Sequence, residues 1–220
     1  MRHEQDFILR HFQQVGRLAA RVLGLAGGGQ YAQAHEAIAQ TAGELFGLDL
    51  DALLHIADED ILAHFQLDTA VSWVEQCILL ATLFQKDADI FAAEDRLDES
   101  YPRYLKALNL LLAALNSGHD LFVPENAPSV PGLMAELEDV ILPDATRTAL
   151  LGYYEQSRQF DKAEDVLFAW LEDDPAAVLA YEMGEAFYGR LQNLSDAELI
   201  AGNLPRAEVE AGLAELRKME

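Results

Sequence analysis

The chain has 220 residues, of which 51% are hydrophobic, and it carries a net charge of −23 at neutral pH. This hydrophobic share is enough to bury a sizeable core and excludes a disordered chain. Proteins bind nucleic acid through clustered lysine and arginine, so the strong negative charge argues against nucleic acid as a partner. Because the longest apolar runs are too short to span a membrane, we expect a soluble, cytoplasmic protein.

The first predicted element is an amphipathic helix over residues 4–26. Arg10, Arg17 and Arg21 share one face of it, opposite an apolar stripe. The stripe repeats at alternating four- and three-residue spacings: Ile8, Phe12, Val15, Ala19, Val22 and Ala26. Two interpretations stay open, because the stripe could belong to the core or the basic helix could dock on a membrane surface or an acidic partner. Glycines at positions 27–29 end this helix.

Helical periodicity continues, and we find no β-hairpin signal anywhere in the sequence. A second helix is predicted over residues 30–46. Two short helices follow, with Asp49 or Leu50 opening the first and Asp58 capping the second. A long helix then begins at Asp68 and leads into the centre of the chain.

Residues 84–115 indicate two helices folded back on each other by a short polar turn. A second copy of this hairpin covers residues 150–175, and a fainter one covers residues 18–46. In each copy a bulky residue opens the second helix and a small residue follows three positions later: Tyr31 and Ala34, Leu97 and Ser100, Phe160 and Ala163. We expect the two helices to approach closely at each small residue. Successive small residues are separated by about twice the roughly 34-residue period of tetratricopeptide repeats.

At these positions the chain resembles the tetratricopeptide family. The residues that carry the resemblance are Tyr154, Phe160, Ala163, Leu167 and Pro175 in one hairpin and Ala88, Phe91, Ser100, Tyr104 and Ala107 in another. The sequence departs from the family at Trp170, where a small residue is usual, and at Leu112, where a proline is usual. The resemblance implies stacked hairpins with a groove lined by the first helix of each pair, and a role in binding proteins.

A second resemblance covers more of the chain. Residues 47–54, 104–112, 163–168 and 194–213 look like an uncharacterised bacterial family of acidic, tetratricopeptide-like helical proteins. This resemblance implies an all-α fold and brings no activity with it.

We therefore predict an all-α protein whose antiparallel helical hairpins stack as a tetratricopeptide-like solenoid or bundle. Residues 1–220 are predicted to form a single domain, and a seam in the proline-containing loop 118–131 is left open. Helices are expected to resume at residues 132–141, 144–157 and 160–172. Three features predict the remaining helix boundaries: Pro175 and Pro205 begin helices, Ser195 and Glu198 form a capping box, and Gly202 ends a helix.

Nothing in the sequence predicts catalytic chemistry, a metal site or a cofactor. The six histidines are scattered without an HExxH motif, and the acidic clusters lack the pattern of a calcium loop. Cys77 lies in an apolar helical run and is expected to be buried and unreactive. Acidic residues 172–174 are expected at a helix C-terminus, where the helix dipole gives no reason for them. An enzyme that uses helix-borne carboxylates and a bound metal remains a further alternative.

The leading hypothesis is a non-enzymatic protein–protein interaction module or scaffold, of unknown process, that binds a peptide or protein along a hairpin groove. The groove-facing residues predicted from the family geometry are Gln85, Asp89, Ala92, Thr148, Gly152 and Glu155. The acidic composition favours a basic partner, and self-association is left open. The alternative function is a peripheral membrane adaptor that docks through residues 4–26.

Overall fold

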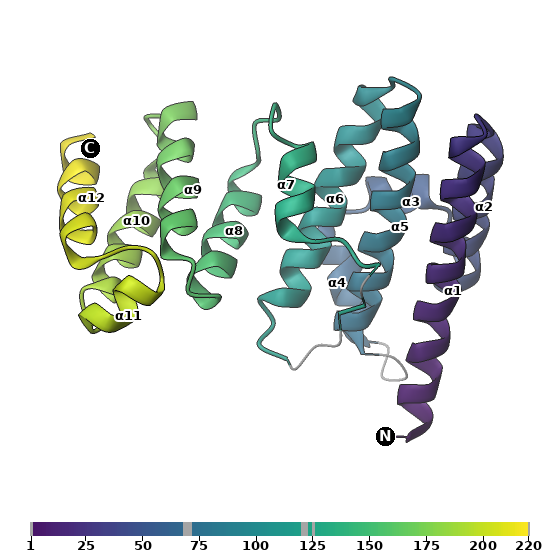
Figure 1. The fold of residues 1–220 in the computed structure, drawn as a ribbon, viewed down its shortest axis with the longest axis horizontal. Helices are drawn as coiled ribbons and strands as arrows, with labels where there is room; N and C mark the ends of the chain where they lie inside the picture. Colours follow the sequence, from purple (N-terminus) through teal and green to yellow (C-terminus); the bar gives the residue numbers. More distant parts are fainter. Residues whose placement is uncertain (1, 68–71, 120–122, 125, 220) are drawn as a thin grey trace. The chain divides into compact units, whose positions relative to one another are not determined.

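The computed structural model describes residues 2–67, 72–119, 123–124 and 126–219, with side chains described from residue 10 onward. Within these residues the chain forms twelve α-helices and no strand (Figure 1). The predicted all-α fold class is confirmed. The chain divides into two compact units, an N-terminal unit of residues 1–140 and a C-terminal unit of residues 141–220.

The N-terminal unit contains seven helices among its described residues: α1 (Arg2–Gly27), α2 (Tyr31–Phe46), α3 (Leu50–His55), α4 (Asp58–Leu67), α5 (Trp73–Ala93), α6 (Leu97–Leu115) and α7 (Val130–Glu136). α5 lies at the centre, in contact with α1, α2, α4 and α6. From Cys77 to Phe84 every side chain except Thr82 is apolar, and a helical segment that is apolar on all sides must be buried. Phe84 and Ala88 are accordingly inaccessible to solvent.

The C-terminal unit contains five helices among its described residues: α8 (Asp144–Gln156), α9 (Phe160–Asp173), α10 (Val178–Leu191), α11 (Asp196–Ala201) and α12 (Arg206–Met219). α8 and α9 form a hairpin, and α10 packs against α9 and α12. Trp170, Phe187 and Tyr188 are the largest side chains buried in this unit. A Cβ atom on Gly184 of α10 would lie within 3 Å of side-chain carbons of Leu167 and Leu216, so this glycine permits the helices to approach.

Three hairpins are closed by the same turn. The residue two positions before the second helix has a left-handed backbone in each: Gly29 at φ 71°, Asp95 at φ 61° and Arg158 at φ 55°. The next amide donates back to the carbonyl five residues earlier: Gln30 to Leu25 at 2.9 Å, Arg96 to Phe91 at 2.9 Å and Gln159 to Tyr154 at 2.8 Å. This is the hydrogen bond of a Schellman turn, which satisfies the carbonyls at a helix C-terminus. The predicted hairpins thus share a backbone geometry as well as a residue pattern.

The small residues lie where the sequence predicts close helix contacts. Ala34, Ser100 and Ala163 are each 0% exposed. The Ser100 hydroxyl donates to the carbonyl of Ala88 on the facing helix, at 3.1 Å. Two helix starts are also confirmed: Asp49 caps α3 by accepting from the Ala52 amide at 2.7 Å, and Ser195 and Glu198 form the expected capping box.

Several boundaries differ from the prediction. α10 begins at Val178 rather than at Pro175, because residues 174–177 form a turn before it. α7 covers Val130–Glu136 rather than residues 132–141, and it packs on α6. The two compact units divide after residue 140, and the seam in the loop 118–131 stays a prediction. The predicted helix start at Asp68 lies outside the described residues.

Asp58 opens α4 as expected, but its carboxylate does not cap the helix. One carboxylate oxygen lies 2.6 Å from Nζ of Lys106 and the other accepts from the Asn109 side chain at 2.7 Å. Lys106 also donates to the carbonyl of Ile56. The side chain that local sequence suggested as a cap therefore ties α4 to α6.

Candidate partner-binding surfaces

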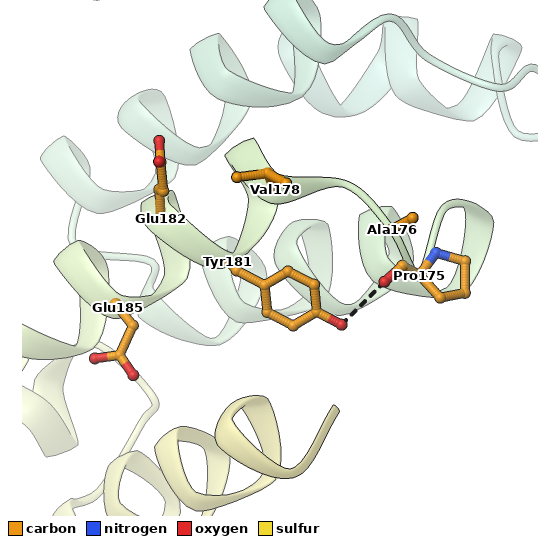
Figure 2. A pocket seen from close by; sticks show the side chains of 6 residues that line it. All are labelled: Pro175, Ala176, Val178, Tyr181, Glu182 and Glu185. Carbon is orange, nitrogen blue, oxygen red and sulfur yellow. Dashed lines mark hydrogen bonds between the residues drawn. The ribbon is translucent and has the colours of Figure 1, made fainter. Parts of the chain in front are cut away.

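A groove in the C-terminal unit lies along the start of α10. Its volume is about 480 Å³, and it is lined by Pro175, Ala176, Val178, Tyr181, Glu182 and Glu185. Figure 2 shows Pro175 and Ala176 toward one end, the Tyr181 ring in the middle and the two glutamates toward the other end. The lining therefore combines an apolar floor with carboxylates at one end.

The helix pattern explains why this surface is open. Ala180, Gly184 and Phe187 face inward and pack against neighbouring helices, so the opposite side of α10 is left for solvent. Val178 stands 68% exposed at the first position of the helix. An apolar side chain this exposed next to others in a hollow is a feature of binding surfaces.

Tyr181 is held in place at the centre of the groove. Its hydroxyl oxygen lies 3.1 Å from the Pro175 carbonyl oxygen (Figure 2). The same oxygen lies 2.9 Å from the carbonyl oxygen of Met219, the last residue of α12. A hydroxyl has one proton to donate, so the two carbonyls share it. Both contacts fix the ring before a partner binds. Binding on the ring would therefore cost little side-chain entropy in the groove.

The two glutamates of the groove differ in their surroundings. Glu185 forms a two-pronged ion pair with Arg217 of α12, at 2.7 Å to Nε and 3.0 Å to Nη2. The hydrogen bond from Arg217 lowers the pKa of Glu185. Glu182 is exposed and makes no hydrogen bond or ion pair within the described part of the chain. Its charge is therefore available to a partner.

Contacts at the end of α9 and in the turn before α10 explain the positions of Asp173 and Asp174, for which the helix dipole gives no reason. Asp173 pairs with Arg147 of α8, whose guanidinium is buried and also donates to the carbonyl of Trp170 at 3.4 Å. Asp174 accepts from the amide of Ala176 at 3.0 Å, which closes an Asx turn. Asp173 thus ties the end of α9 to α8, and Asp174 shapes the turn that leads into α10.

The six predicted groove residues fall on two helices in different units. Gln85, Asp89 and Ala92 form one half-buried stripe of α5. Asp89 is already occupied, since it accepts from Tyr104 at 2.9 Å and pairs with Lys86 at 2.8 Å.

Thr148, Gly152 and Glu155 form a half-buried stripe of α8. Glu155 makes a two-pronged ion pair with Arg190 of α10, at 2.6 and 2.8 Å. Neither stripe lines the groove of α10, and a role for these six residues in binding stays a prediction.

An ionic cluster joins four helices of the N-terminal unit. Asp87 of α5 is buried and accepts from Nε of Arg103 at 2.5 Å and from His35 at 2.6 Å. Arg103 also pairs with Asp51 of α3. A small open pocket of about 130 Å³ lies beside the cluster, and Ala39, Leu50 and Phe91 also line it. Buried ion pairs of this kind hold helices in register at a cost in desolvation, so the cluster has a structural explanation.

The surroundings of His35 favour its charged form. Its second ring nitrogen lies 3.0 Å from Glu94, so both nitrogens face carboxylates. Carboxylates accept hydrogen bonds, and only an imidazolium can donate from both nitrogens. Burial opposes this charge, but the hydrogen bonds to Asp87 and Glu94 outweigh it and raise the pKa of His35.

A second, apolar pocket of about 250 Å³ lies where α2, α3 and α4 meet. Its lining is mainly aromatic and aliphatic: Phe46, Leu48, Leu53, Ile56, Asp60, Ile61, His64 and Phe65.

As expected, Cys77 is buried, and burial raises the pKa of its thiol to about 12. No group of three or more candidate metal ligands occurs among the residues that the structure describes.

One comparison with known proteins is informative. The model of a family described as "Family of unknown function (DUF6483)" matches residues 2–220. The chain belongs to that family. This agrees with the resemblance to an uncharacterised family, and it brings no activity. The tetratricopeptide-like character of the repeats stays a prediction.

No curated protein and no solved structure matches this member of the family. The helices in its described residues include none that is both long and apolar enough to cross a membrane.

Sequence reasoning missed the groove of α10. A weak signal was present, because Val178 and Tyr181 are large residues three positions apart and the inward-facing Ala180 and Gly184 are small. That spacing indicates a second, outward apolar edge on the helix. The prediction that Pro175 begins a helix hides the turn that opens the groove.

Proposed function

We propose that this family member is a non-enzymatic interaction module that binds a peptide or protein segment in the groove of α10. The observation that carries the proposal is the open apolar floor of Val178, Pro175 and a fixed Tyr181. Rigid aromatic and apolar residues in a hollow are typical of the centre of a binding site. The process that the module serves stays open.

The alternative of membrane docking through residues 4–26 has less support. Such docking needs the apolar face of α1, and Phe12, Val15 and Val22 on that face are buried where α1 packs on α2 and α5. The side chain of Ile8 lies outside the described residues. Arg17 and Arg21 remain exposed on the other face, where they offer charge without apolar anchors.

The proposal is tested by differential capture with the full chain. Val178→Asp places a charge on the apolar floor, and Ile200→Asp is a matched control because Ile200 of α11 is 63% exposed and lies outside the groove. Tagged wild type and both variants are incubated with native lysate, and bound proteins are identified by mass spectrometry. We expect a partner that stays with wild type and Ile200→Asp and is lost with Val178→Asp. Equal retention by all three would refute binding in this groove.

A further inference from the structure

We propose that the groove of α10 recognises an arginine or lysine side chain of its partner segment, with Glu182 binding the cation and Tyr181 and Val178 covering the aliphatic stem. This inference rests on the proposed function and names the chemistry of the partner. It makes Glu182 the residue that determines specificity.

The first support is the charge at the groove. Arginines from Arg96 onward each have a carboxylate partner, yet Glu182 has no cation within the described residues. A free carboxylate beside an apolar floor fits an amphipathic side chain better than a purely apolar or an acidic one. The chain's net charge of −23 would also raise the rate at which a basic segment arrives.

The second support is that a carboxylate of α10 already binds a guanidinium group in this chain. Glu185, one turn from Glu182, holds Arg217 of α12 with two hydrogen bonds. The face of α10 can therefore present a carboxylate in the geometry that a fork of N–H donors requires. Glu182 offers that contact without an occupant.

The third support is the shape of the floor. Long basic side chains bury their methylene groups along apolar surface while the charged head stays in water. Val178 and Glu182 lie on the same side of α10 in Figure 2, and the Tyr181 ring lies on the neighbouring side of the helix. A stem that crosses Val178 would therefore bring its head to the Glu182 carboxylate. A cation near the face of such a ring gains further attraction from its π electrons.

The test uses a displayed library of random dodecapeptides, selected against the immobilised full chain. We expect the selected peptides to be rich in arginine or lysine next to an apolar residue. A consensus peptide is then titrated by fluorescence anisotropy against wild type, Glu182→Lys and Glu210→Lys. Glu210 is an exposed residue of α12 outside the groove, so its variant makes the same change in charge elsewhere.

Glu182→Lys should weaken binding by about fivefold or more, near the upper end for an exposed ion pair, while Glu210→Lys changes it less than about twofold. Replacing the peptide's basic residue by leucine should remove the difference between wild type and Glu182→Lys. Peptides that need Val178 but show no basic enrichment, or that bind both lysine variants alike, would overturn the inference and leave the proposed function standing. If no peptide distinguishes wild type from Val178→Asp, the proposed function fails as well.

Discussion

Gly212 of α12 lies directly against the hydroxyl group of Tyr188 on α10. A Cβ atom at position 212 would lie 2.2 Å from that oxygen and 2.4 Å from Oε1 of Glu164, to which Tyr188 donates at 2.6 Å. The absence of a side chain on α12 therefore makes room for a hydrogen bond between α10 and α9. Three helices of the C-terminal unit meet at this point.

Replacing this glycine should destabilise the C-terminal unit. We expect Gly212→Ala to lower the free energy of unfolding by about 1 to 3 kcal/mol, as overpacking of a core does. Gly189→Ala is the matched control, because a Cβ atom there meets nothing within 4 Å. It should raise stability by up to about 1 kcal/mol through helix propensity. Urea unfolding followed by Trp170 fluorescence in a Trp73→Phe background measures both, and equal effects would contradict the packing explanation.

Removing the Tyr188 hydroxyl should produce a pH-dependent loss of stability. Burial raises the pKa of Glu164, and the hydrogen bond from Tyr188 limits that rise. Tyr188→Phe leaves the carboxylate without this donor, at a cost of about 1 to 3 kcal/mol where Glu164 is ionised. When a carboxyl group has a higher pKa in the folded state than in the unfolded state, the folded protein loses stability as the pH rises. The loss of stability caused by Tyr188→Phe should therefore be larger at pH 7 than at pH 4. Denaturant titrations at both pH values check this, and a defect that grows on acidification would contradict it.

The stabilising contribution of His35 to the N-terminal unit should be lost at alkaline pH. Its folded-state pKa is raised, so its contribution is fully present below the unfolded value of about 6.5 and is lost as the pH rises through the folded value. We expect His35→Gln to cost about 1.5 kcal/mol at pH 6, in the range for hydrogen bonds to charged groups, and less at pH 9. The difference in unfolding free energy between wild type and variant is the measurement. A difference that stays constant with pH would mean that His35 is neutral.

One hairpin turn can be improved. Asp95 holds a left-handed backbone at φ 61°, a conformation that costs a residue with a Cβ atom about 1 kcal/mol and costs glycine little. Asp95→Gly should therefore raise the melting temperature. The same substitution at Asp98, inside the first turn of α6, should lower it. Thermal unfolding followed by circular dichroism compares the two variants. A lower melting temperature for Asp95→Gly would argue against a left-handed backbone at position 95.

Local patterns were sufficient to predict most of the fold. The helical spacing of Leu167 and Trp170, the small Ser100 and the capping box at Ser195 each depend on residues within a few positions, and each lies as expected. The error at Pro175 has a local cause too, because proline is favoured both in a first helical turn and in the turn before a helix.

The contacts that close the candidate sites could not be predicted in this way. His35 and Asp87 are 52 residues apart, and Tyr181 reaches Met219 across 38 residues. Such pairs are set by how helices pack, and no periodicity within one helix encodes the partner. The predicted stripe of α5 illustrates the limit, since the carboxylate of Asp89 is taken by Tyr104 and Lys86.

The burial of Cys77 gives this chain a practical advantage. It is the only cysteine, it is inaccessible to solvent, and burial raises the pKa of its thiol to about 12, so it reacts slowly with alkylating reagents at neutral pH. A cysteine introduced at the rim of the α10 groove would then be the one fast-reacting thiol. A fluorophore or photo-crosslinker could be attached there without altering the native cysteine, so the natural chain is already a background for covalent trapping of whatever enters the groove.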